Sequence, residues 1–172
     1  MNLRLENTQK ALEGFRDYVI GKSKYNLSKA GKKASGDLYN GLAGEVHTSA
    51  NSIEVKFEMP FYGTFQDKGV NGIRSAFSTP YSFKNKMPNI DAIASWAKKK
   101  NIRLRDSKGR FQKGNYKTIG FIFARSIYKK GIKPSLFFTK PFEEAFEKLP
   151  IEVLEAFGLD MDDFFGYTTR QI

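Results

Sequence analysis

The sequence predicts one α+β domain, in which a long N-terminal helix and two to three further helices pack on an antiparallel sheet. Residues 6–32 repeat apolar side chains at helical spacing, residues 53–59 alternate apolar and charged side chains, and further helical patterns follow from residue 89. Helical and strand periodicities in separate stretches of one chain are typical of this class. Hydrophobic residues make up 40% of the 172 residues, which is enough to form a core.

The first helix and a β-hairpin account for the N-terminal third of the sequence. The helix ends near Gly31, and its apolar face consists of Leu12, Phe15 and Val19. Residues 38–48 end in a β-compatible run, and residues 53–59 alternate strictly, as half-buried strands do. Residues 49–52 are small and polar, which predicts a hairpin turn between the two strands.

Long loops separate the middle helices. Residues 66–88 are rich in Gly, Ser, Asn and Lys, and we expect them to be mobile in the isolated chain. Asn89 is a good N-cap for a helix, and the composition of residues 102–117 indicates an exposed basic loop or hairpin. Thr118 is then expected to cap a second middle helix, and both middle helices should pack against the sheet.

The C-terminal part is expected to contain a short helix and an arm. Pro141 can open the helix, and Phe142 and Phe146 share one face that we expect to dock on the sheet. Gly158 should end the helical structure. The domain therefore covers residues 1–158, and residues 159–172 form an acidic extended arm whose removal should spare the melting temperature.

The net charge of +11 is distributed unevenly along the chain. Residues 84–133 contain 15 Lys or Arg and two Asp, a net charge of +13, whereas residues 134–172 contain three basic and eight acidic residues, a net charge of −5. Such a distribution favours contact with nucleic acid or charge pairing between copies of the protein. The alternative is that these charges form a solvated surface that only keeps the protein in solution.

The positive charge is concentrated in one segment, residues 98–117. Phe111 and Tyr116 lie among its cations, and such groups bind phosphates without reading sequence. We expect this segment to face DNA or a neighbouring subunit. Its basic residues are Lys98, Lys99, Lys100, Arg103, Arg105, Lys108, Arg110, Lys113 and Lys117.

Catalytic patterns are weak. The sequence has no cysteine and one histidine, His47, so catalytic triads and most zinc sites are excluded. Glu54 and Lys56 have the spacing of a nuclease strand, although any amphipathic strand shows the same pattern, and the acidic run 160–163 lacks the spacing of a calcium loop. We therefore expect no enzyme activity, no metal and no cofactor.

The N-terminus lacks a signal-peptide pattern, and no apolar run approaches the ~20 residues of a membrane helix, so we expect a soluble protein.

The order of the predicted elements, together with two short motifs, resembles that of the small neck or tail-completion proteins of tailed bacteriophages. The first is a Tyr-Gly pair with an acidic residue and a glycine soon after, and the second is a Pro-Phe-x-x-Ala element. Together with their spacing, the resemblance covers roughly residues 5–148. The motif residues are Tyr62, Gly63, Asp67, Gly69, Pro141, Phe142 and Ala145.

The resemblance implies a structural virion protein, made in the host cytoplasm, that forms an oligomeric ring around the DNA channel between head and tail. Its implied partners are copies of itself, portal, adaptor or tail proteins, and packaged double-stranded DNA in the channel, with no membrane. A non-specific DNA-binding accessory protein that uses residues 98–117 is the alternative. A metal-dependent nuclease acting through Glu54 and Lys56 is a third hypothesis.

Overall fold

The structure is a computed structural model, which describes residues 5–31, 36–48, 52–112 and 114–169. It has the predicted α+β composition, with a two-stranded antiparallel sheet and a long N-terminal helix packed against it. Where the sequence predicted one domain, the chain forms two compact units. Unit 1 contains the N-terminal helix, the hairpin and the C-terminal helices, and unit 2 contains residues 61–136. The inserted segment is long enough to form apolar contacts of its own, which the periodicity of single elements does not reveal.

Unit 1 is built on helix α1 (Glu6–Lys29), as predicted, and the short helix α2 (Asp37–Asn40) follows it. The predicted apolar face is buried along α1: Leu12, Phe15 and Val19 are 8%, 6% and 0% exposed. Burial of this face, rather than helix propensity, supplies most of the stability of such a helix.

The predicted hairpin is present. Strand β1 (Ala43–Thr48) pairs antiparallel with β2 (Ile53–Glu58), with Val46 opposite Val55. The predicted turn falls largely on residues 49–51, outside the described residues. Gly44 allows β1 to approach α1 closely, because a Cβ atom there would lie 2.9 Å from Arg16 Cγ.

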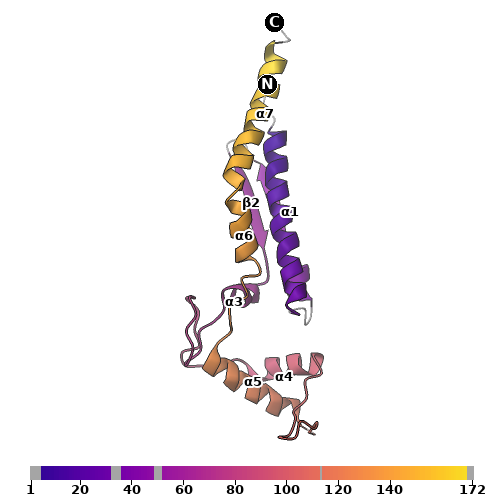
Figure 1. Cartoon of the computed structure of the whole chain (residues 1–172), viewed down its shortest axis with the longest axis vertical. Coiled ribbons are helices and arrows are strands. Elements are labelled where there is room, and N and C mark those ends of the chain that lie inside the picture. The colour runs from indigo at the N-terminus through magenta and orange to yellow at the C-terminus, as the bar shows by residue number, and fades with distance from the viewer. Residues whose placement is uncertain (1–4, 32–35, 49–51, 113, 170–172) are drawn as a thin grey trace. The chain divides into compact units, whose positions relative to one another are not determined.

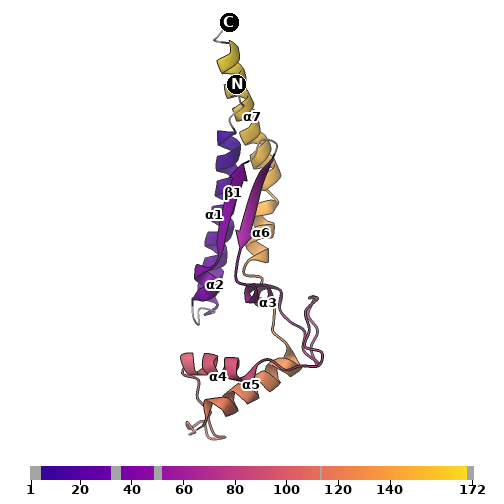
Figure 2. The ribbon, with the colours of Figure 1, turned by 180° about the vertical axis from the view of Figure 1, so that it is seen from behind.

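Helices α6 (Thr139–Phe146) and α7 (Leu149–Thr169) complete unit 1, and α7 lies beside α1 in both views (Figure 1 and Figure 2). The prediction that Gly158 ends the helix and an extended arm follows is wrong, because α7 continues to Thr169. A helical glycine costs only about 1 kcal/mol relative to alanine. Contacts of Ala156 and Asp160, both buried, outweigh that cost.

The core of unit 1 brings its N-terminal and C-terminal segments together. Leu27, Leu38, Leu42 and Phe137 form one buried cluster, 0–4% exposed. Beside it, Phe142 contacts Phe57 of β2 at a centroid distance of 6.0 Å and Phe15 of α1 at 5.6 Å. The prediction that the Phe142 face docks on the sheet is therefore confirmed. Phe146 stacks on Phe142 at 5.6 Å but remains 52% exposed.

Unit 2 contains α3 (Tyr62–Lys68), α4 (Ile90–Lys99) and α5 (Tyr116–Lys130). The two middle helices pack on each other inside unit 2. Gly120 permits this close packing, since a Cβ atom there would lie 2.6 Å from the carbonyl oxygen of Ile90. The rings of Trp96 and Phe123 meet edge to face at 5.8 Å.

The capping predictions for these helices are partly confirmed. Asn89 caps α4 by accepting a hydrogen bond from the Ala92 N–H at 3.0 Å, and Gly131 ends α5 with a φ of 73°. The N-cap of α5 is Asn115, whose side chain accepts from the Lys117 N–H at 3.0 Å, and not Thr118. Both residue types are good caps, and the earlier one adds most of a turn to the helix.

Asn71 is the centre of a hydrogen-bond network in the loop 66–88, whose mobility in the isolated chain stays a prediction. The Asn71 N–H donates to the carbonyl of Tyr81 at 2.8 Å, and the Asn71 carbonyl accepts from the N–H of Phe83 at 2.9 Å. Its side chain donates to the Thr79 carbonyl at 3.0 Å and accepts from the Phe77 N–H. The loop aromatics also find a partner, since Tyr81 packs on Phe65 at 4.8 Å.

We expect Asn71→Ala to loosen this loop without unfolding unit 1. The substitution removes two side-chain hydrogen bonds that close the loop and leaves the backbone pair with Tyr81 and Phe83. Limited proteolysis should then cut residues 73–87 faster than in the parent chain. Equal cleavage rates would mean that the side-chain bonds do not hold the loop.

Candidate nucleic-acid interface

The segment between α4 and α5 forms the predicted basic hairpin. Arg105 and Phe111 form an antiparallel bridge, the Gln112 N–H donates to the Leu104 carbonyl at 2.9 Å, and the Asp106 N–H donates to the Arg110 carbonyl at 2.9 Å. Gly109 has a φ of 78°, which glycine adopts at little cost at a tight tip. The hairpin therefore has a defined backbone although its side chains are charged.

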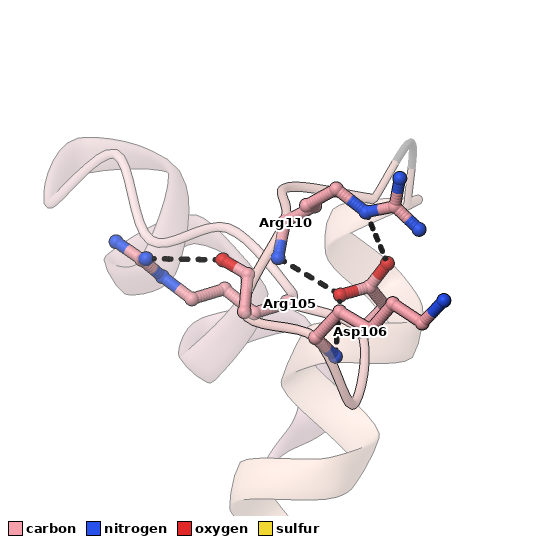
Figure 3. A network of polar contacts seen from close by, with 5 residues as sticks. Arg105, Asp106 and Arg110 are labelled. Atoms are coloured by element: carbon pink, nitrogen blue, oxygen red, sulfur yellow. Dashed lines mark hydrogen bonds and ion pairs between the residues drawn. The ribbon is translucent and has the colours of Figure 1, made fainter.

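Asp106 organises the tip of the hairpin. Its Oδ1 accepts from the Lys108 N–H at 2.9 Å and the Arg110 N–H at 2.8 Å, and its Oδ2 pairs with Arg110 Nε at 3.2 Å (Figure 3). The carboxylate thus acts as the acceptor of an Asx-type turn. The composition of residues 102–117 predicted a loop or hairpin but did not show that Asp106 holds two of the backbone N–H groups there.

The guanidinium groups of two hairpin arginines pack on the ring of Phe111. The ring is 61% exposed, and the guanidinium carbon of Arg105 lies 4.3 Å from its centroid, whereas that of Arg103 lies at 5.9 Å. Arg105 Nη1 also donates to the Gly109 carbonyl at 3.2 Å (Figure 3). These contacts orient the guanidinium groups by cation–π attraction while leaving them at the surface.

A cavity of about 360 Å³ opens beside the hairpin. Arg103, Leu104, Phe111 and Tyr116 contribute to its lining, so a cation and aromatic rings meet at one hollow. Aromatic and arginine side chains are the groups on which nucleic-acid bases stack, and arginine also binds phosphate.

The remaining predicted cations surround this hairpin in the chain and are exposed. Lys98 and Lys99 form the last turn of α4, Lys100 caps it, and Lys117 is in the first turn of α5. Lys113 lies outside the described residues. The sequence interpretation missed a second cationic group in unit 2, formed by Arg74, Arg125 and Lys129; the i, i+4 spacing of the last two was the available signal.

The first family-like motif has a structural place in unit 2. Tyr62 is 47% exposed at the start of α3, and Gly63 is buried. The carbonyl of Asp67 accepts from the N–H groups of Ser135 and Leu136, both at 3.0 Å. Gly69 has a φ of 77°, and a Cβ atom there would lie 2.6 Å from the Ile132 carbonyl oxygen. The motif therefore joins the end of α3 to the segment that leaves α5.

The second family-like motif lies in unit 1. Pro141 is fully buried in the first turn of α6, where a missing N–H costs nothing, and Phe142 is in the aromatic cluster. Ala145 is half-buried in the last turn of the same helix. The structure thus gives both motifs packing roles and divides them between the two units.

The residues considered for catalysis lie on the solvent face of the hairpin in unit 1. Lys56 Nζ lies 2.5 Å from Glu58 Oε1, and Glu54 is exposed on the same strand. His47 Nε2 lies 3.0 Å from Glu45 Oε2 at an exposed position. In the part of the chain that the structure describes, no three acidic or histidine side chains gather as a metal site would require.

Comparison of the chain with protein-family models, with curated proteins and with solved structures returned no match. Among the described helices, none combines the length and the hydropathy needed to cross a membrane.

Proposed function

We propose that this chain is a structural subunit of a tailed-bacteriophage virion, a neck or head–tail connector (tail-completion) protein. In this role it forms an oligomeric ring around the DNA channel and performs no catalysis. The observation that carries the proposal is the cationic hairpin 103–112, a defined structure that presents Arg103, Arg105 and Arg110 at the surface of unit 2. The two motifs that resemble the phage family support it.

The hairpin suits contact with a DNA backbone. Its only carboxylate, Asp106, is engaged by the backbone of the turn and by Arg110, which leaves Arg103, Arg105 and Lys108 to set the outward charge. Cations of this kind bind phosphates through charge alone and release counterions from DNA. A ring that passes DNA of any sequence requires contacts of this sequence-independent type.

The direct test is the location and size of the parent chain. A density map of the particle should place it in the neck, and the purified chain should self-associate or join a portal when measured by sedimentation. A chain that is absent from the neck and stays monomeric with every neck partner would contradict the proposal.

A non-specific DNA-binding accessory protein is the second candidate, and the exposed Phe111 ring favours it. Stacking of a base on an aromatic side chain is worth about 1–3 kcal/mol, and it requires unpaired bases. Phe111→Ala should therefore weaken single-stranded DNA binding by that amount if the accessory role is correct. A ring subunit that touches duplex backbone should bind duplex DNA almost unchanged after the same substitution.

The charge of the hairpin is tested by changing Lys99, Arg103, Arg105, Lys108 and Arg110 to Gln together. Folding should be nearly unaffected because exposed charges contribute little to stability. The dependence of DNA affinity on salt should become shallower, by about 0.9 in the log–log slope for each phosphate that the variant no longer neutralises.

The matched control changes five exposed lysines elsewhere, so that the net charge falls equally. These are Lys10, Lys22, Lys29, Lys84 and Lys86. The control should keep the parent slope in a salt titration followed by fluorescence anisotropy. If both variants lose DNA affinity and assembly to the same extent, the hairpin acts only through the overall charge.

A further inference from the structure

Helix α7 has apolar side chains on two faces. One face packs on α1 through residues such as Ala156, 8% exposed. The other, which we call the α7 stripe, consists of Ile151, Leu154, Phe157, Gly158 and Met161. In the stripe Ile151, Leu154 and Phe157 are 64%, 71% and 40% exposed.

The spacing of the α7 stripe is that of a helix that pairs with another helix. Ile151, Leu154, Gly158 and Met161 follow one another at intervals of three, four and three residues, the heptad pattern of paired helices. A Cβ atom added at Gly158 would meet nothing within 4 Å, so the stripe has a gap that can admit a side chain of a partner.

The charge of α7 indicates which kind of helix can pair with the α7 stripe. Between Leu149 and Thr169 the sequence has five acidic residues and no Lys or Arg, and Glu155 and Asp162 flank the stripe. Two copies of α7 paired with each other would bring these carboxylates together, which is unfavourable. The stripe therefore fits a helix that is apolar in the middle and basic at its borders.

Helix α5 has that character on its exposed face, which we call the α5 face. Phe121 and Ile122 are 45% and 47% exposed there, Arg125 follows Phe121 by four residues, and Lys129 follows Ile122 by seven. The helix contains four basic residues and no acidic one. The charges of Arg125 and Arg74 lower the pKa of Lys129, so this surface gathers positive charge.

We propose that the α5 face of one copy docks on the α7 stripe of the next copy. The inference rests on the proposed ring and names its subunit contact: Phe121 and Ile122 meet Leu154 and its neighbours, while Arg125 and Lys129 meet Glu155 and Asp162. Such a contact is heterologous, because two different surfaces meet, and heterologous contacts close into rings when the rotation between subunits permits.

A charge-swap experiment on the full chain tests this pairing. One variant carries Arg125→Glu and Lys129→Glu, and the other carries Glu155→Lys and Asp162→Lys. Each variant alone should self-associate at least about tenfold more weakly than the parent in sedimentation velocity, a decrease of about 1.4 kcal/mol or more in the free energy of each subunit contact. A chain that combines all four substitutions should recover parental assembly, because its reversed α5 face then meets a reversed α7 stripe.

The apolar part of the contact has a matched control on the same helix. Leu154→Ser should weaken assembly, whereas Leu159→Ser, which changes a leucine 57% exposed outside the stripe, should leave it unchanged. Melting temperatures of both variants verify the fold. A fourfold variant that fails to recover, or equal effects of the two Ser variants, overturns the inference. If the parent chain forms rings through another surface, the proposed function stands and only this inference fails. If the parent chain is absent from the neck, the proposed function and this inference both fail.

Discussion

Phe137→Ala is expected to reduce the free energy of unfolding of unit 1 by about 3–5 kcal/mol, as truncation of a fully buried phenylalanine does. Phe137 is 2% exposed and packs with Leu27, Leu38 and Leu42, so it connects the returning chain to α1 and α2. The cavity left by the ring would lie at the point where the two ends of unit 1 meet.

The matched control for this substitution is Phe146→Ala. Phe146 is 52% exposed and its main ring contact is Phe142, so we expect a decrease below about 1 kcal/mol. Urea unfolding followed by circular dichroism measures both. Trp96, the single tryptophan, lies in unit 2, and its fluorescence reports on that unit alone. Similar decreases for both variants would show that the Phe137 cluster does not hold unit 1 together.

Local signals explain what the sequence predicted correctly. The apolar spacing of α1, the strict alternation of β2 and the cap at Asn89 all act within a few residues. Each is decided by backbone geometry and by one buried face, so the elements could be placed without knowledge of their neighbours.

Tertiary contacts explain what the sequence pattern did not reveal. The division into two compact units depends on which helices α4 and α5 contact, and periodicity does not state this. The continuation of α7 past Gly158 depends on contacts with α1 far away in sequence. The hydrogen bonds that close the loop 66–88 depend on Asn71, one of several similar loop residues, whose position opposite Tyr81 exists only in the folded chain.

The candidate site shows the same division. Its cations and Phe111 could be identified from composition, because a dense basic segment is visible in the sequence. The arrangement of Arg105 over Phe111 and the two N–H groups held by Asp106 require the bridge between the two arms. The cluster that adds Arg74 to α5 joins residues about 50 positions apart.

Asp160 is the second residue whose removal should be costly, and it changes the expectation for the C-terminal segment. Its Oδ1 accepts from the Asn7 N–H at 2.8 Å, and its Oδ2 accepts from the Thr8 N–H at 2.9 Å and the Thr8 hydroxyl at 2.6 Å. A carboxylate of α7 thus caps the first turn of α1, where negative charge is favoured. Deletion from Leu159 onward should therefore lower the melting temperature and not spare it.

Asp160→Ala should reduce the stability of unit 1 by about 2–3 kcal/mol, in the range of a buried, charge-assisted hydrogen bond. Asp163→Ala, an exposed acid on the same helix, is the matched control and should have little effect. Equal melting temperatures for parent and Asp160→Ala would mean that water replaces the cap without cost.

The pH dependence gives a second measurement of the same contact. Burial by itself would raise the pKa of Asp160, but the hydrogen bonds from Thr8 and Asn7 outweigh it and hold the pKa below its ordinary value of 3.8. A carboxyl group with a depressed pKa stabilises the fold fully above about pH 5, and this contribution is lost as the pH falls through the folded pKa. The stability difference between the parent and Asp160→Asn should therefore be constant from about pH 7 to about pH 5 and shrink below about pH 4. A difference that stays constant down to about pH 3 would show that the Asp160 charge is not what joins α7 to α1.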